Sequence, residues 1–311
     1  MRAGLLRRLR QLRRPRLRHL RHPLVLALVV AVLCGTGVGL YLNERSSRQQ
    51  ISVVGNPTVP DWIELDVTAQ GVDTSALELA LSVTAIPHGS FAAEPDSPDS
   101  PAFAKNVEIT TVSLSTTSFH TTPGEPAPLQ VVTAGLYDGT PTDYPFDHYD
   151  ISAGWIATVD GHAVPLAVTF SDSDPFFVVR PSKSATAGQV ARLDARASRS
   201  RATFILAWFM MIAMWALALA VLGGAEVLAR RRQGMVWPAL GWMAATLFAL
   251  VGLRNAAPGG PPIGSLMDYV AFFWAEGIIA ASLACAAALG VRNERRTLAA
   301  EKAEKAAPSS A

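Results

Sequence analysis

The segment 144–150, Tyr-Pro-Phe-Asp-His-Tyr-Asp, is the densest group of chemically versatile side chains outside the apolar parts of the sequence. Pro145 fixes the backbone of a turn, and Tyr144 and Phe146 place an aromatic ring on either side of it. Asp147 can accept hydrogen bonds from nearby backbone N–H groups. The pattern predicts an aromatic-anchored turn that leads into a strand, with a binding or coupling role as the alternative.

Metal binding by this segment is disfavoured. Asp147, His148 and Asp150 carry suitable ligand atoms, but adjacent residues on a strand point to opposite faces. The sequence also lacks a nucleophile elbow, a phosphate-binding loop, an HExxH motif and a dinucleotide fingerprint. Cys34 and Cys285 both lie in apolar runs, so we expect neither a disulfide framework nor a cysteine zinc site. No catalytic, metal or cofactor residue is predicted.

The segment 254–268 contains three Pro and three Gly residues between two apolar runs. Such residues fix the shape of a short loop at low entropy. Arg254 and Asp268 bracket the loop at one depth and could form an ion pair. The loop is either a rigid connector or a contact site for the domain formed by residues 43–201.

Glu276 is a carboxylate inside an apolar run, where a charge costs about 2.5–3.5 kcal/mol at the centre of a bilayer. It should therefore face protein or water, or be protonated. We expect it in a helix interface, with Arg254 or Thr246 as a possible partner. A proton or ion relay and snorkelling towards the surface are the alternatives. The interface expectation rests on the alanine row that Glu276 continues, which is Ala280, Ala284, Ala288.

Four apolar runs are long enough to carry these residues through a membrane. Segment 23–42 has 20 uncharged residues, and 20 helical residues span about 30 Å, the thickness of a bilayer core. Three further segments, 202–228, 235–253 and 269–291, are also long apolar runs. They predict four transmembrane helices, and a cleaved signal peptide is the alternative reading of the first.

The distribution of positive charge predicts the orientation. Segments 1–22, 223–234 and 292–311 carry 17 of the 27 Lys and Arg residues. By the positive-inside rule both termini are cytoplasmic, and segments 43–201 and 254–268 are extracytoplasmic. The sequence therefore predicts a multi-pass protein of the cell membrane, with the lipid bilayer as its main partner.

Arginines are also concentrated before the second predicted span. We expect them to contact lipid phosphates, or to belong to a solvated helical lead-in; they are Arg192, Arg196, Arg199 and Arg201.

Small residues recur at four-residue spacing in every predicted span. Such stripes let membrane helices approach closely, and they predict a packed bundle or a homo-oligomer. The stripes are Ala27, Ala31, Gly35, Gly39; Ala216, Ala220, Gly224; Gly241, Ala245, Ala249; and Ala280, Ala284, Ala288.

Residues 51–182 have the pattern of β structure. Apolar residues alternate with polar ones, as in half-buried strands, and turn residues separate the runs. About seven short strands predict an antiparallel β-sandwich, so the fold class is α+β with four transmembrane helices. The predicted strands are Trp62–Thr68, Leu77–Thr84, Val107–Ser115, Leu129–Leu136, Tyr149–Thr158, Pro165–Phe170 and Phe176–Arg180.

Composition limits the possible functions. Half of the 311 residues are hydrophobic and 17% are charged, against about a quarter charged in ordinary soluble domains. A net charge of +2 gives no global attraction to nucleic acid. We expect a binding or assembly module of the cell envelope with an unknown ligand. A pore gated by the outer domain and a membrane enzyme with an unrecognised site are the alternatives.

Three motifs, YPFDHY, LRNAAPGGPPIGSLMDY and FFWAE, resemble an uncharacterised membrane family, the domain-of-unknown-function family DUF4436, over about residues 25–291. That resemblance implies the same layout and no activity. A weaker likeness links the Tyr144–Asp147 turn and the Arg254–Asp268 loop to pentameric ligand-gated channels. The sequence departs from those channels: no cysteines flank the turn, and segment 235–253 is a poor polar pore lining.

Overall fold

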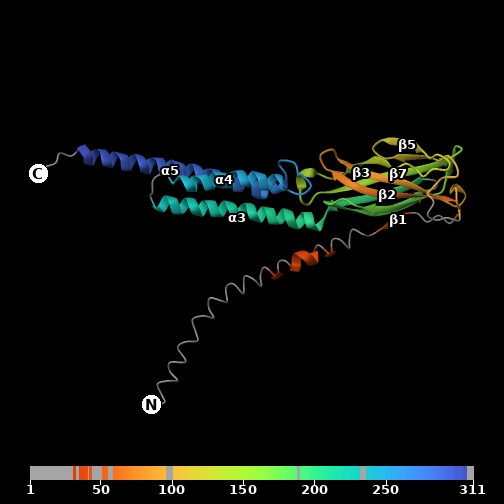
Figure 1. Ribbon diagram of the computed structural model, residues 1–311, viewed down its shortest axis with the longest axis horizontal. Coiled ribbons are helices and arrows are strands. Elements are labelled where there is room, and N and C mark those ends of the chain that lie inside the picture. The colour runs from red at the N-terminus through yellow and green to blue at the C-terminus, as the bar shows by residue number, and fades with distance from the viewer. Residues whose placement is uncertain are drawn as a thin grey trace, which may run out of the picture. The chain divides into compact units, whose positions relative to one another are not determined.

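The computed structural model describes residues 31–32, 35–40, 42–43, 51–54, 59–95, 101–187, 190–231 and 236–306. The chain divides into two compact units, Met1–Gln49 and Gln50–Ala311. The predicted first span, 23–42, lies mostly outside the described residues, and those described within it are helical. The second unit is α+β, with a large β region followed by three helices (Figure 1).

The β region, called the β domain here (residues 51–199), contains eleven described strands. It also has two short 3-10 turns, Gly89–Phe91 and Pro141–Asp143. The strands are β1 (Ser52–Val54), β2 (Trp62–Asp73), β3 (Glu78–His88), β4 (Glu108–Val112), β5 (Thr116–His120), β6 (Gln130–Tyr137), β7 (His148–Val159), β8 (His162–Val164), β9 (Leu166–Asp172), β10 (Phe177–Ala187) and β11 (Val190–Arg199).

These strands form a sandwich-like, nearly closed sheet. Their main order is β1-β9-β2-β3-β6-β7-β11-β10; β4 and β8 also pair with β7, and β5 pairs with β4. Strands β1 and β10, at the two ends of this order, contact each other. The expectation of a wholly antiparallel sheet is wrong, because β2 and β9 pair in parallel. Strands β2 and β9 are far apart in the sequence, so local pattern could not reveal their pairing.

Alternation along the strands builds the core. On β2, Ile63, Leu65 and Val67 are fully buried, while the residues between them are more exposed. The largest fully buried side chain, Trp155, projects from β7. A side chain of this kind removes on the order of 150–250 Å² from water, so this face supplies much of the hydrophobic stabilisation.

Strand β11 was not among the predicted strands. Its buried face consists of Leu193 and small alanines, residues with weaker strand signals than Val or Ile. The helical lead-in expected here is wrong, because Arg192, Arg196 and Arg199 lie on this strand. Each of the three is paired with a carboxylate of the β domain.

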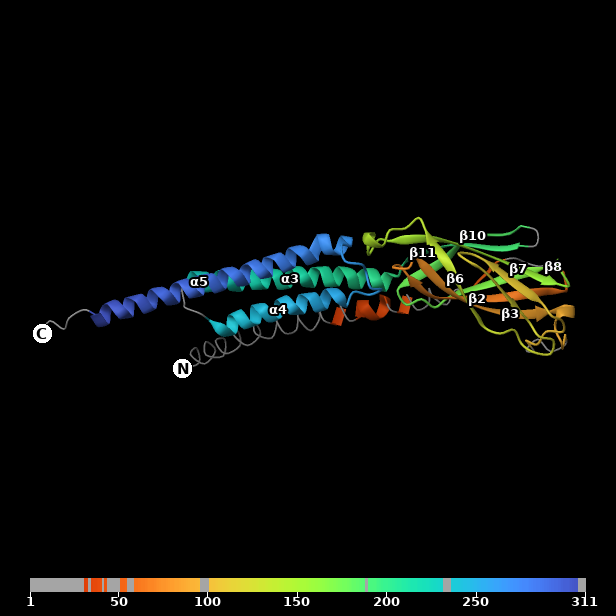
Figure 2. The same cartoon turned by 90° about the horizontal axis from the view of Figure 1, so that it is seen from above.

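Three helices follow, and all are long and apolar enough to cross a membrane by length and composition. They are α3 (Arg201–Arg231), α4 (Trp237–Asn255) and α5 (Phe273–Ala306), which is preceded by the π-helical turn η3 (Asp268–Phe272). Figure 2 shows the three helices running side by side, with the β domain beyond one end. The Trp215 indole of α3 donates a hydrogen bond to the Val270 carbonyl of the π-helical turn at 3.1 Å.

The helices pack through rows of larger residues than predicted. Met210, Met214 and Val221 of α3 are buried, as are Met243 and Leu250 of α4. The small-residue stripes of these spans are mostly exposed instead. Spacing shows which residues share a helix face, but not which face turns inward. On α3 and α4 larger side chains fill much of the space between the helices, because they bury more apolar surface per residue, whereas the inward row of η3 and α5 includes the small residues Ala271 and Ala275.

Candidate functional site

The predicted Tyr144–Asp147 turn lies where the β domain meets the helices. Tyr144 is fully buried in the apolar cluster of the helix bundle, together with Ala257 and Met267 of the loop that follows α4. The Tyr144–Pro145 peptide bond is cis. The ring of Phe146 meets that of Phe204 on α3 edge to face, with centroids 5.4 Å apart. The turn is therefore a contact between the two parts of the chain.

The turn ends in a buried ion pair between Asp147 and Arg199. The Asp147 carboxylate accepts hydrogen bonds from Arg199, from Nε to Oδ1 at 2.9 Å and from Nη2 to Oδ2 at 2.9 Å. The Arg199 and Asp147 side chains are 2% and 0% exposed. The Tyr149 hydroxyl donates a further hydrogen bond to Oδ2 at 3.0 Å. The Asp147 carboxylate therefore accepts hydrogen bonds from side chains on two strands, Tyr149 on β7 and Arg199 on β11.

Aromatic rings enclose the Arg199 guanidinium. Its carbon lies 4.1 Å from the centre of the Phe177 ring and 4.9 Å from that of Tyr144, which is cation–π geometry. Burial raises the pKa of Tyr144 to about 12, against the opposing charge of Arg199. Burial and the charge of Asp147 also raise the pKa of Tyr149. Both phenols stay neutral near pH 7, and the Tyr149 hydroxyl remains a donor.

Arg199 also reaches the loop between α4 and η3, residues 256–267. Its Nη1 is buried and has no hydrogen-bond partner within the described part of the chain. A Cβ built at Gly259 would lie 2.1 Å from this nitrogen. Gly259 also has a φ of +73°, in the region that favours glycine. The guanidinium therefore needs a glycine at this point of the loop.

A second buried ion pair closes the 256–267 loop on itself. Arg254 donates from Nε and Nη2 to the two Asp268 carboxylate oxygens, at 2.9 and 2.7 Å. It also donates to the Pro261 and Pro262 carbonyls, at 3.1 and 2.8 Å. The Gly264 amide donates to Asp268 at 2.7 Å. All three donor nitrogens of Arg254 are used, so this pair is a clamp that gives the Pro- and Gly-rich loop one shape.

The structure thus brings together the two polar segments singled out in the sequence, with Arg199 between them. Arg199 and Tyr149 are the site residues that sequence reasoning missed. The signal for Arg199 was its place at the end of an alternating run, which puts it on the same face of β11 as the buried alanines. Its aspartate partner is 52 residues away, beyond the reach of spacing rules.

Glu276 does not take part in this site. Its side chain is partly buried on α5, and no hydrogen bond or ion pair reaches its carboxylate from the described residues. The expected partners are engaged elsewhere: Arg254 with Asp268, and Thr246 with the Trp242 carbonyl at 2.8 Å. The alanine row that Glu276 continues is also not buried. The inward row of this segment is Ala271, Ala275, Ile279 and Ser282.

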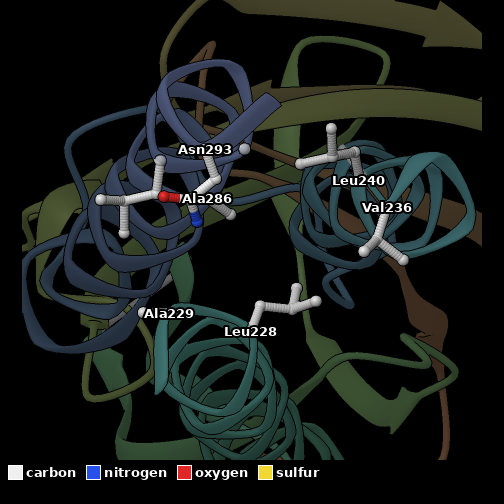
Figure 3. Close-up of a pocket in the computed structure, with 8 residues that line it drawn as sticks. Leu228, Ala229, Val236, Leu240, Ala286 and Asn293 are labelled. Atoms are coloured by element: carbon white, nitrogen blue, oxygen red, sulfur yellow. The ribbon is translucent and has the colours of Figure 1, made fainter. Parts of the chain in front are cut away.

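A cavity between the three helices lies at the end away from the β domain (Figure 3). Its volume is about 20 Å³, room for about one water molecule. Leu228, Leu240 and Ala286 contribute apolar side chains to its lining, and Asn293 contributes a polar one. It is too small for a substrate. In the part of the chain that the structure describes, no group of three or more His, Cys, Asp or Glu residues is placed to hold a metal ion.

The buried pair predicts a large effect of removing either partner. Asp147→Ala or Arg199→Ala leaves a buried charge alone, and each should lower the free energy of unfolding by about 3–5 kcal/mol. Asp147→Leu combined with Arg199→Met should lower it by much less than the sum. Denaturant unfolding of the detergent-solubilised chain, followed by tryptophan fluorescence, measures both effects.

Arg196→Ala is the matched control on the same strand. Its pair with Asp150 is 57% and 44% exposed, so its loss should cost under about 1 kcal/mol. An equal effect of Arg196→Ala and Arg199→Ala would contradict the special role of the buried pair.

Gly259→Ala tests the contact between Arg199 and the loop. The new Cβ would collide with the guanidinium at a φ that alanine rarely adopts, so stability should fall by about 1–3 kcal/mol. Gly252→Ala in α4 is the control, because nothing lies within 4 Å of its Cβ position. Thermal unfolding in detergent measures both variants. Equal unfolding midpoints for wild type and Gly259→Ala would show that the loop accommodates the added methyl group without loss of stability, and would contradict the prediction.

Comparison with known proteins divides the chain at this junction. Residues 53–197 match the family described as Domain of unknown function (DUF4436), and residues 199–293 match Domain of unknown function (DUF8686). No curated protein matches the chain. The YPFDHY motif lies in the first match, but the other two motifs lie in the second, so the match to DUF4436 covers residues 53–197 and not the predicted 25–291. Asp147 and Arg199 therefore join the two matched regions, and the resemblance of the β domain to the DUF4436 family is confirmed.

Proposed function

We propose that this chain is an integral protein of the cell membrane, with an extracytoplasmic β domain that binds or assembles with partners and is coupled rigidly to its transmembrane helices. The observation that carries this proposal is the short connection between the β domain and the helices. Strand β11 ends at Arg199 and α3 begins at Arg201, so a single residue separates the domain from the bundle. A domain that only needed tethering would sit on a flexible linker.

Exposed apolar surface supports the placement in a membrane. Along the helices Phe209, Phe248 and Trp274 are 64%, 79% and 63% exposed. Large side chains exposed in this way over whole helices would be an aggregation hazard in water, whereas lipid covers them favourably. The segments rich in Lys and Arg lie at the ends of α3 and α5 away from the β domain, which supports the orientation with the β domain outside.

The outward stripes support assembly into a homo-oligomer. Ala220 of α3, Ala245 of α4 and Ala284 of α5 are exposed in the single chain. Small residues that are unused within a bundle allow the helices of a second copy to approach closely. We therefore propose contacts between copies through these stripes.

A subunit of an oligomeric pore is the second candidate. The observation in its favour is the position of the Tyr144 turn and the 256–267 loop at one junction, where movement of the β domain would reach the helices. Against it, α4 offers one polar side chain in mid-helix, Thr246, and its hydroxyl is already bonded to the Trp242 carbonyl. A binding or assembly role remains the first choice.

Labelling of single cysteines tests the orientation. In a chain with Cys34 and Cys285 replaced by serine, Ser115→Cys in the exposed β4–β5 hairpin should react with an impermeant maleimide added to intact cells. Arg231→Cys should react only after the membrane is opened. The opposite pattern would overturn the extracytoplasmic placement of the β domain.

Mass measurement of the purified protein tests assembly. We expect a mass of at least two chains after subtraction of detergent, and dissociation when Ala220, Ala245 and Ala284 are all replaced by leucine. The matched control is leucine at Ala202, Ala229 and Ala300, which are exposed near helix ends. A monomeric wild type would contradict assembly. Ion flux into liposomes that is lost in the stripe variant would favour the pore.

A further inference from the structure

An open cleft lies where the β domain meets the helices. Its volume is about 800 Å³, within the range of about 300–1,000 Å³ that is typical of ligand sites. Four segments form its walls: the turn between β2 and β3, the loop before β10, the first turns of α3, and the loop after α4. The lining residues are 72–75, 176, 206 and 255–260.

Hydrogen bonds hold the walls of this cleft in place. The Asp174 carboxylate accepts from the backbone amides of Val72 at 2.6 Å and Phe176 at 2.7 Å. The Asp73 carboxylate accepts from the Ser75 amide at 2.8 Å, which fixes the turn between β2 and β3. The clamp described above fixes the loop after α4. The cleft is therefore preformed, and a ligand would not have to order its walls.

Thr74 places an unsatisfied hydroxyl in the cleft. The residue is only 4% exposed and belongs to the cleft lining. Its hydroxyl forms no hydrogen bond with any residue that the structure describes. By contrast, the buried hydroxyls of Ser200 and Thr203 at the same junction are bonded to each other at 3.0 Å. Because an enclosed polar group without a partner is unfavourable, Thr74 points to a ligand that supplies the missing hydrogen bond.

The polar groups of the cleft suit a neutral ligand. No Lys, Arg or His belongs to the lining residues that the structure describes, so a phosphate or carboxylate would find no cationic side chain there. Asp73 is exposed at the rim, where an ion pair with an ammonium group contributes little. The Thr74 and Ser75 hydroxyls and the Asn255 amide can each donate and accept hydrogen bonds. Hydroxyl groups of a ligand have the same double capacity.

The apolar part of the cleft suits a sugar ring joined to a lipid. Phe176 is 40% exposed and offers an aromatic face against which the C–H face of a sugar ring can pack. Leu206 is 44% exposed and lies about 8 Å along α3 from its start. If the helices span as proposed above, the cleft opens at the outer surface of the membrane. A headgroup can then enter it while its acyl chains stay in the lipid.

We propose that this cleft binds the neutral sugar headgroup of a membrane glycolipid, with a sugar hydroxyl on Thr74, the ring against Phe176 and the acyl chains beside Leu206. The proposal rests on the binding role proposed above for the β domain, and it gives that role a site and a class of ligand.

Native mass spectrometry of the full-length protein in the sugar-free detergent lauryldimethylamine oxide, titrated with monoglucosyl diacylglycerol, tests the proposal. Thr74→Val keeps the shape of the side chain and removes the hydroxyl, so binding should weaken by about three- to tenfold. The thermal unfolding midpoint without lipid should not fall, because the hydroxyl has no partner in the described chain. A lower midpoint with unchanged binding would show a structural role and overturn the proposal.

Thr84→Val on β3 is the matched control, because Thr84 lies outside the cleft lining. It should bind monoglucosyl diacylglycerol within about twofold of wild type. Diacylglycerol with the same acyl chains lacks the sugar and should bind wild type at least about tenfold more weakly. Equal binding of the two lipids would show that the cleft does not recognise a sugar. Tighter binding of phosphatidylethanolamine would assign the cleft to an ammonium group; either result would overturn the proposal.

Ser75→Trp fills the cleft from the exposed turn and leaves Thr74 in place. It should weaken binding of monoglucosyl diacylglycerol several-fold, and unchanged binding would place the lipid elsewhere. Methyl glucoside at equal concentration should not compete in wild type, whereas competition would show a site for free sugars and overturn the glycolipid. These measurements need no cell membrane, so they can fail or succeed independently of the labelling and mass measurements that test orientation and assembly.

Discussion

The Arg199 guanidinium is the group on which the arrangement of this molecule depends most. It is buried between two aromatic rings, paired with Asp147 and pressed against Gly259. Three segments that are distant in the sequence therefore meet at one side chain: the turn before β7, the end of β11 and the loop after α4. A buried charge tolerates little freedom, because any movement that separates it from its carboxylate leaves both groups unsolvated.

The second buried pair makes this arrangement possible. A loop of glycines and prolines with an open shape would offer Arg199 no fixed surface. The clamp between Arg254 and Asp268 holds backbone carbonyls and amides as well as the two side chains. The loop that faces Arg199 is therefore itself rigid. The Arg254–Asp268 pair fixes the shape of the loop, and Arg199, which is held by Asp147, packs against that loop.

Sequence reasoning succeeded where the signal was local. Alternation in Trp62–Thr68 and apolar length in 202–228 correctly indicated a strand and a helix, because each depends on neighbouring residues. It failed where the answer depends on distant residues. The parallel pairing of β2 with β9, the role of Arg199 and the inward faces of the helices are set by tertiary packing. Strand β11 was missed for another reason: its buried face is mostly alanine, which has a weaker strand signal than Val or Ile.

The single residue between β11 and α3 gives the junction a mechanical property. Ser200 donates its backbone N–H to the Phe176 carbonyl, and its side chain is hydrogen-bonded to that of Thr203 at 3.0 Å. The connection is therefore short and fixed at both its backbone and its side chain. Helix α3 has 31 residues and is about 46 Å long. If the base of the β domain tilts, a helix of this length moves as a lever with its fulcrum there. A tilt of about 5° at the fulcrum would move the far end of such a helix by about 4 Å, so a small strain in a strand becomes a displacement as large as a side chain at the opposite end.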